Sequence, residues 1–321
     1  MTTIANLVLP LFGLILLGFI AARLVRQPET TLGWLSIFII YLALPALFFK
    51  LLAKTPIEQL ANWDFIATNL GATFVVFLAV FLIARLVGHA TRKEATIQGL
   101  AGAYGNIGYM GPALAILTFG EAAAVPVAII FCFENIMHFS LVPIMMAKSD
   151  GGRQSSARLV IGIVRSFAFH PFIIATALGI AAAATQVSIP EPVANLVDYL
   201  AQAAAPSALF ALGVTLAISP LKRFPAELSF IMPAKLLIHP LVMYLLLSWA
   251  GDFDRVWVLT AVLLAALPTA TNVFVLAQQY GVWINRASAS LLTSTLASVL
   301  TLSALLYAVT TGIIPHDLFS N

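Results

Sequence analysis

The sequence predicts an all-α membrane protein of ten transmembrane helices, arranged as two inverted five-helix repeats. Three observations predict this fold class: the composition, the spacing of the apolar segments and an internal repeat. Because 61% of the residues are hydrophobic and only 9% are charged, the composition excludes a soluble globular protein. The net charge of +3 is small and predicts no nucleic-acid partner.

The apolar segments recur along the whole chain. A helix needs about 20 apolar residues to cross the roughly 30 Å hydrocarbon core of a bilayer. Segments of this length predict ten spans, at 4–25, 32–53, 65–88, 96–119, 122–147, 158–184, 193–218, 229–250, 255–281 and 286–313.

The arginine and lysine residues predict the orientation, since cationic loops near helix ends stay in the cytoplasm. Basic residues follow the odd-numbered spans: Arg23, Arg26, Arg85, Arg92, Lys93, Lys148, Arg153, Arg158, Lys222, Arg223 and Arg286. The opposite loops are mainly acidic, with Lys54 and Arg255 as exceptions. We therefore expect both termini to lie outside the cytoplasm.

The chain also matches itself when it is shifted by 161 residues, without a gap. The aligned pairs are Pro10 with Pro171, Gly18 with Gly179, Pro45 with Pro206, and Phe119-Gly120 with Tyr280-Gly281. Each repeat holds five helices, so the second repeat must enter the membrane from the opposite side, as in many secondary transporters. The predicted domains are a first repeat at 1–148, a cytoplasmic linker at 149–157 and a second repeat at 158–321.

The fourth span of each repeat contains residues that interrupt helices. Glycines recur at every third position from Gly99 to Gly111, and Pro112 follows. Each glycine costs a helix interior roughly 1 kcal/mol relative to alanine. The ninth span is interrupted at Leu267–Phe274, which is polar and contains Pro268. Broken helices in a membrane line a cavity or are buried in protein, so the two interrupted spans predict a binding site. For Gly99 and Gly102, a seam of small residues between packed helices is the alternative.

The residues at the two interruptions are the candidate substrate site. They are Tyr104, Gly105, Asn106, Tyr109, Gly111, Pro112, Pro268, Thr269, Thr271 and Asn272. The N-terminus of a half-helix carries partial positive charge, which suits an anion. Asparagine amides donate to a carboxylate or accept from a cation, so coupling to Na+ stays open beside coupling to a proton.

Ionisable and polar residues inside the expected spans are the coupling or charge candidates, because burying them in a membrane is unfavourable. They are Glu134, Asn135, His138, Lys235 and His239. Glu134 either carries a coupling proton or makes a structural hydrogen bond to a neighbouring helix. Lys235 either attracts a carboxylate or extends to the cytoplasmic interface. His170 is expected to be structural, and no cofactor or metal is expected.

Three motifs carry a family resemblance: Ala43-Leu44-Pro45-Ala46-Leu47, Asn106-Ile-Gly108-Tyr-Met-Gly111-Pro112 and Leu267-Pro268-Thr-Ala-Thr-Asn272-Val-Phe. Together they resemble the auxin efflux carrier family, and the likeness to bacterial malonate and malate permeases extends over essentially the whole chain. The resemblance implies a fold like that of bile-acid/sodium symporters, with broken helices 4 and 9 crossing. It also implies scaffold helices 1, 2, 6 and 7, transport helices 3–5 and 8–10, a homodimer and the bacterial inner membrane.

The function that the resemblance implies is transport of small organic anions by alternating access, with lipid and a small carboxylate as partners. The Asn-Pro-Asn motif of the plant members is absent, which argues against auxin itself as the substrate. The alternative function is an exporter or uniporter of an auxin-like aromatic carboxylate. A passive anion channel is an alternative of a different class. An enzyme is not expected, since the chain lacks His-Glu-x-x-His, Gly-x-Gly-Asp and Gly-x-x-x-x-Gly-Lys.

Overall fold

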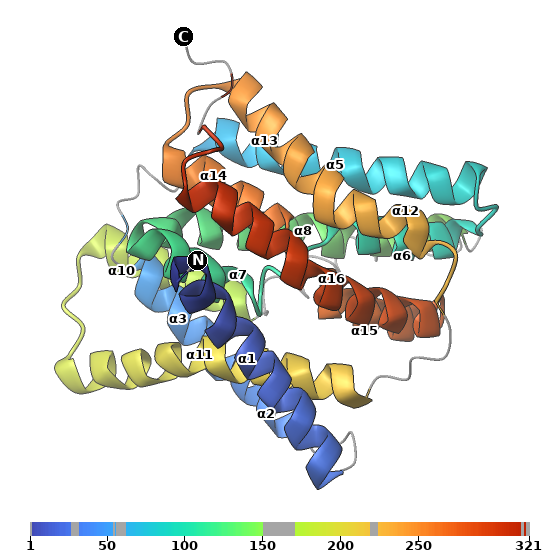
Figure 1. The fold of residues 1–321 in the computed structure, drawn as a ribbon. Coiled ribbons are helices and arrows are strands. Elements are labelled where there is room, and N and C mark those ends of the chain that lie inside the picture. The colour runs from blue at the N-terminus through green and yellow to red at the C-terminus, as the bar shows by residue number, and fades with distance from the viewer. Residues whose placement is uncertain are drawn as a thin grey trace. The chain divides into compact units, whose positions relative to one another are not determined.

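The computed structural model describes residues 2–26, 32–53, 55, 62–149, 171–218, 224–315 and 318. Within these residues every regular element is a helix (Figure 1). Residues 150–157 of the expected linker, Lys54 and His170 lie outside the described residues.

Several helices in the described part of the chain are suited to a membrane. Those long and apolar enough to cross it are Leu32–Leu52, Trp63–Leu86, Gly111–Met146, Glu191–Ile218, Leu228–Ala250 and Ile284–Thr310. Shorter apolar helices lie at Leu9–Val25, Ile173–Thr185 and Arg255–Ala265. The expected multi-pass character is therefore present, whereas the number of ten spans stays a prediction.

Residue contacts divide the chain into two compact units. Unit 1 comprises Met1–Trp63, Gly108–Cys132 and Val164–Ile218, and unit 2 comprises Asp64–Ile107, Phe133–Ile163 and Ser219–Asn321. The chain therefore passes between the units inside the fourth and fifth expected spans. The division into two inverted repeats is not tested by these contacts and stays a prediction.

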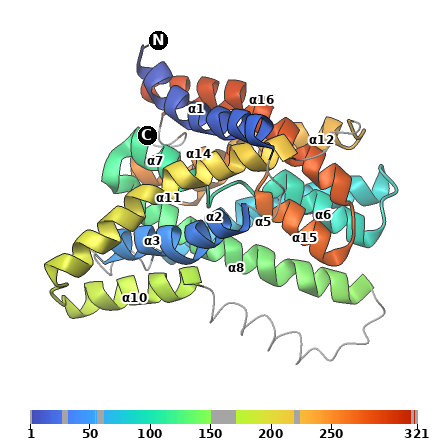
Figure 2. The same cartoon turned by 90° about the horizontal axis from the view of Figure 1, so that it is seen from below.

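Unit 1 is built from helices that pack against one another in pairs. α1 (Thr2–Val25) crosses and packs against α11 (Glu191–Ile218), and α10 (Pro171–Thr185) packs against α3 (Leu44–Leu52), as Figure 2 shows. α2 (Leu32–Phe38) joins α3 through a π-helical turn at Ile39–Ala43. The unit also holds α7 (Gly111–Phe119), a 3-10 turn at Gly120–Ala123 and the start of α8 (Ala124–Ser149).

Glycines allow these pairs of helices to approach closely. A Cβ on Gly18 would overlap the backbone carbonyl of Phe210, and one on Gly179 would lie 3.1 Å from the carbonyl oxygen of Phe49. A Cβ on Gly213 would likewise overlap the backbone carbonyl of Ile15. Small residues at such interfaces are how membrane helices gain van der Waals contact.

Unit 2 contains the longer helices α5 (Trp63–Leu86), the rest of α8 and α16 (Ile284–Thr310). Its other helices are α6 (Arg92–Ala103), α12 (Leu228–Pro233), α13 (His239–Ala250), α14 (Arg255–Ala265) and α15 (Thr271–Tyr280). A π-helical turn, Ala234–Ile238, joins α12 to α13. α13 packs along α14, and α15 packs along α16.

The first two glycines of the periodic row lie within α6 and pack against α5. A Cβ on Gly99 would lie 2.9 Å from the ring of Phe77, and one on Gly102 would lie 2.6 Å from Val80 Cγ2. The small-residue seam that the sequence left open is therefore the observed role of these two glycines. α6 stays unbroken through both of them and ends at Ala103.

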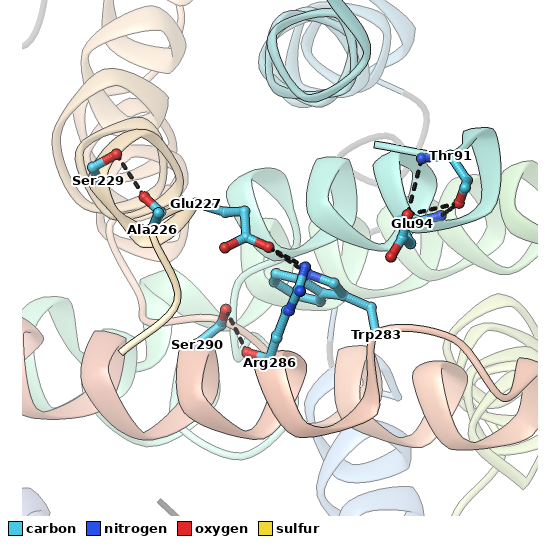
Figure 3. Close-up of polar contacts among 8 residues, drawn as sticks. All are labelled: Thr91, Glu94, Ala226, Glu227, Ser229, Trp283, Arg286 and Ser290. Atoms are coloured by element: carbon cyan, nitrogen blue, oxygen red, sulfur yellow. Dashed lines mark hydrogen bonds and ion pairs between the residues drawn. The ribbon is translucent and has the colours of Figure 1, made fainter. Parts of the chain in front are cut away.

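Polar and charged side chains contact one another near the N-terminal ends of helices in unit 2 (Figure 3). At the start of α6, Thr91 and Glu94 form a capping box, in which each side chain bonds the backbone N–H of the other residue. Before α12, Glu227 accepts from Arg286 at 2.5 Å and from the Trp283 indole at 3.3 Å. The second contact fixes Trp283, whose backbone is left-handed with φ +59°.

Candidate functional site

The two helix breaks meet inside unit 2. Following α6, residues 104–106 are extended, and they run antiparallel to residues 268–270, which follow α14. Asn106 N donates to Pro268 O at 2.8 Å, and Ala270 N donates to Tyr104 O at 2.9 Å, with Gly105 opposite Thr269. Each break therefore supplies hydrogen-bond partners for backbone groups that the other leaves free, as an interrupted membrane helix requires.

Side chains from other helices hold the breaks in place. Thr269 Oγ1 donates to Ala101 O in the last turn of α6 at 2.8 Å, and Thr269 N donates to Ser294 Oγ at 3.1 Å. Lys235 Nζ donates to the carbonyl of Ala265, the last residue of α14. A cation at this end of a helix also interacts favourably with the helix dipole.

Gly105 occupies a position that admits no side chain. A Cβ there would lie 2.9 Å from the carbonyl oxygen of Leu264 and 3.3 Å from Lys235 Nζ. The first of these neighbours is backbone, which cannot rotate away. The absence of a side chain at Gly105 thus allows the ammonium of Lys235 to lie directly beside the break.

Tyr104 links the breaks to α8. Its hydroxyl donates to Asn135 Oδ1 and accepts from Asn272 Nδ2 at 2.8 Å. The ring of His138 stacks on the Tyr104 ring with 4.2 Å between centroids. The structure therefore brings together, around one tyrosine, residues that the sequence predicted separately for the substrate site and for coupling.

A chain of hydrogen bonds joins the buried ionisable residues. Thr73 Oγ1 donates to Glu134 Oε1 at 2.9 Å and lies 3.2 Å from His239 Nε2. On the other side of the ring, His239 Nδ1 lies 3.0 Å from Lys235 Nζ. Glu134 therefore makes the hydrogen bond to a neighbouring helix that the structural alternative predicted, and a role in coupling stays a prediction.

Lys235 does not extend to an interface. Its side chain is 0% exposed and is directed at Ala265 O and His239. The alternative in which this lysine reaches the cytoplasmic surface is therefore wrong. The physical reason is that its ammonium finds two acceptors inside the protein, one of them the carbonyl end of a broken helix.

Two hydrogen-bonding groups near the breaks are buried but unused. Within the part of the chain that the structure describes, Asn106 Nδ2 and Thr271 Oγ1 have no hydrogen-bond partner. Thr271 is the first residue of α15, where backbone N–H groups lack partners within the helix. Buried polar groups are normally satisfied, so unpaired donors beside a helix N-terminus can serve to bind an anion.

Three predicted substrate residues belong to unit 1 instead. Tyr109 lies in the turn before α7, and Gly111 and Pro112 are the first two residues of that helix. Pro268 and Thr269 lie in the extended segment of unit 2, where the Thr269 hydroxyl donates to backbone. Contact of any of these residues with substrate stays a prediction.

Sequence reasoning missed two residues that contribute to this arrangement, Thr73 and Ser294. A signal for Ser294 is present, since Ser290, Ser294 and Ser298 are spaced by four and share one helix face. All three are fully buried in α16. Thr73 follows Asn69 by four residues in the same way, and both are buried in α5.

The comparisons with known proteins decide the family. The sequence pattern of the family described as "Membrane transport protein" matches residues 3–306. The chain belongs to this membrane transport protein family. The match confirms the resemblance to auxin efflux carriers that the sequence motifs indicated, and it extends over nearly the whole chain.

Relatives of this membrane transport protein occur in distant organisms. It is 59% identical over 319 residues to a Rhizobium meliloti protein named "Putative malonate transporter", covering 99% of this chain and 100% of the relative. It is 27% identical over 312 residues to the "Uncharacterized transporter YfdV" of Escherichia coli K12, covering 93% of this chain and 95% of the relative. It is also 26% identical to the mouse "Lysosomal cholesterol signaling protein", covering 89% of this chain and 35% of that protein.

The family match and the first two relatives establish what this chain does at a coarse level. The protein is a multi-pass membrane transporter, as expected, and not an enzyme.

Proposed function

We propose that this protein is a secondary transporter of small carboxylates such as malonate, and that the carboxylate binds at the helix breaks of unit 2. The observation that carries the proposal is the pair of buried, unpaired donors Asn106 Nδ2, on the segment that pairs with residues 268–270, and Thr271 Oγ1, at the N-terminus of α15. The name of the Rhizobium meliloti relative, which is 59% identical, supports malonate as the first substrate to test.

The chemistry of the breaks favours an anion. Backbone N–H groups and the positive end of the dipole at a helix N-terminus attract negative charge, and an amide donor adds direction. The ammonium of Lys235 lies beside Gly105, one residue from Asn106, and contributes a full positive charge. A carboxylate is a planar acceptor with two oxygens, so it can accept from donors of both breaks at once.

Alternating access is the mechanism we propose, with unit 2 moving as a body relative to unit 1. The division of the chain into two contact units supports this, because all the paired backbone of the breaks belongs to unit 2. The proposal includes a homodimer in the bacterial inner membrane with both termini outside the cytoplasm. It leaves the passive channel as an alternative, since a channel conducts without such a movement.

The experiment is uptake of radiolabelled malonate, malate and an aromatic acid into proteoliposomes that contain the purified protein. Gradients of pH, sodium and voltage are imposed one at a time. Saturable malonate uptake, with counterflow when the vesicles are preloaded with unlabelled malonate, is the expected result. Uptake of the aromatic acid alone would overturn the carboxylate class, and flux without saturation or counterflow would indicate a channel.

The site is tested in the same assay by Asn106→Ala and Asn272→Ala. Each change removes an amide at the breaks and should abolish malonate uptake while the protein still elutes as a folded particle. Asn69→Ala is the matched control, because Asn69 is also buried in unit 2 but bonds Met243 Sδ at 3.3 Å. Normal uptake in both site variants would refute the assignment of the site.

A further inference from the structure

The buried hydrogen-bond chain in unit 2 joins a buried carboxyl group to a buried amine. Among the described residues, Glu134 and Lys235 are the only buried carboxylate and the only buried ammonium. They are joined through Thr73 and His239, in the order Glu134, Thr73, His239, Lys235. The two charges thus compensate each other through a neutral hydroxyl and a neutral ring.

The directions of the hydrogen bonds in this chain follow when Glu134 is ionised, because its carboxylate then accepts from Thr73. Thr73 has a single hydroxyl hydrogen, which it donates to Glu134 Oε1, so His239 Nε2 must be the donor to Thr73 Oγ1. A neutral imidazole with Nε2 protonated has Nδ1 free to accept, and Lys235 Nζ donates to it. All donors and acceptors in the chain therefore match when Glu134 is ionised and Lys235 is charged.

A substrate carboxylate changes this balance. An anion bound at the breaks would approach the ammonium of Lys235, which lies beside Gly105. Lys235 would then face two carboxylates, and the buried site would hold an uncompensated negative charge. Such a charge is strongly unfavourable in a low-dielectric interior unless it is paired or neutralised.

We propose that Glu134 takes up a proton when a small carboxylate binds beside Lys235, so that carboxylate and proton occupy unit 2 together. The step forms one O–H bond on Glu134 and breaks one bond to hydrogen in a hydronium ion or a protonated buffer molecule, whose conjugate base is released to the solution, and no bond in the protein is broken. Lys235 keeps its proton and pairs with the substrate. This inference rests on the proposed function, since it needs a carboxylate at the breaks, and it makes the transporter a proton symporter.

The other titratable groups near Glu134 are poorer acceptors of this proton. In His239, Nε2 donates to Thr73, and Nδ1 already accepts from Lys235, so a second N–H would point at the ammonium. A proton on His138, one turn along α8, would add a buried charge to a ring whose nitrogens have no partner among the described residues, whereas a proton on Glu134 removes a buried charge. Tyr104 packs on His138 as a phenol whose oxygen already donates and accepts.

The test is isothermal titration calorimetry of the detergent-purified full chain with malonate, in two buffers of different ionisation enthalpy at the same pH. If binding takes up a proton, the buffer supplies it, and the measured heat differs between buffers. We expect this difference in the wild type, together with an affinity that rises about tenfold for each unit of pH decrease above the titration range.

Glu134→Gln is the decisive variant, because the amide keeps an oxygen that accepts from Thr73 but cannot take up a proton. Its malonate heat should be the same in both buffers, and its affinity should not depend on pH. Glu94→Gln, the same change in the capping box of α6, is the matched control and should behave as the wild type. His138→Gln tests the other nearby base and should also keep the buffer dependence.

The outcomes separate this inference from the proposed function. Absence of any malonate heat in the wild type would overturn the proposed substrate and the inference with it. Malonate binding with equal heats in both buffers would overturn the inference and leave the substrate intact. Buffer dependence that persists in Glu134→Gln, or that disappears in His138→Gln, would also overturn it. If the glutamine variant does not fold, the wild type is titrated with malonamate, which has a single carboxylate, and loss of the buffer dependence would show that the second carboxylate of malonate, and not Glu134, takes up the proton.

Discussion

The hydroxyl of Tyr104 accepts a hydrogen bond from Asn272 Nδ2 at 2.8 Å and so ties the end of α6 to the start of α15. The same hydroxyl donates to Asn135 Oδ1 on α8. Three segments that are far apart in the sequence are thus held by one oxygen atom. This oxygen atom therefore helps to position the proposed carboxylate site.

Tyr104→Phe should weaken malonate binding without unfolding the protein. The ring and its stacking on His138 are retained, but both asparagines lose a partner, which costs about 1–3 kcal/mol when such groups are buried. We expect the affinity for malonate to fall about tenfold or more, measured by calorimetry.

Tyr244→Phe is the control for this change. Its hydroxyl donates to Pro315 O at 2.6 Å, away from the breaks, so its loss should leave malonate affinity unchanged. Equal affinity in the wild type and Tyr104→Phe would show that the hydroxyl does not position the site.

Gly105→Ala should abolish malonate uptake. The added Cβ would lie 2.9 Å from Leu264 O, so the paired backbone of the breaks or the end of α14 must shift, and Lys235 with it. A shift of the paired segments would also weaken the hydrogen bond from Asn106 N to Pro268 O. Uptake into proteoliposomes is the measurement.

Gly71→Ala provides the comparison for Gly105→Ala. Gly71 lies within α5 in unit 2, and nothing lies within 4 Å of an added Cβ. This variant should transport normally and should be about as stable as the wild type or up to about 1 kcal/mol more stable, because alanine favours the helix. Equal loss of uptake in both variants would mean that the effect of Gly105→Ala is not local.

Gly18→Ala should destabilise unit 1. The new methyl group would overlap the carbonyl of Phe210, so α1 and α11 would have to separate along their contact. Overpacking of this kind typically costs about 1–3 kcal/mol. We expect a lower midpoint of thermal unfolding in detergent, whereas Gly13→Ala on the same helix has open space and should not lower it. Identical midpoints for both variants would contradict the close approach.

The stability contributed by Glu94 should depend on pH. The hydrogen bond from the backbone N–H of Thr91 holds the pKa of the Glu94 carboxyl below its ordinary value of 4.5. A carboxyl whose pKa is lowered by folding stabilises the folded state above its unfolded pKa, and this contribution is lost as the pH falls through the lower, folded value. Because Glu94 is partly exposed, we expect the contribution to be at most about 1 kcal/mol.

Thermal unfolding of the wild type and Glu94→Gln at a series of pH values measures this contribution. The wild type should be the more stable of the two at neutral pH, and the difference should shrink as the solution is acidified below the ordinary carboxyl range. A difference that is independent of pH would show that the capping box does not need the charge of Glu94.

The sequence by itself determined the class of protein, the positions of both helix breaks and the identity of most polar residues near them. These features depend on local properties: hydropathy reports the membrane, and glycine, proline and amide residues report where a helix is interrupted. Two of the three family motifs lie at the same breaks, so local sequence was also sufficient to indicate a transporter.

Only the tertiary structure decided which of these residues meet and what each one does. Gly99, Gly102 and Gly105 look alike in sequence, yet two pack against α5 and the third makes room for Lys235. The burial of Lys235 and the hydrogen bonds of Thr73 and Ser294 depend on contacts between different segments, from 25 residues apart for Ser294 and Thr269 to 166 residues apart for Thr73 and His239. Composition and periodicity describe one helix at a time, and the contacts that satisfy buried polar groups are made between helices.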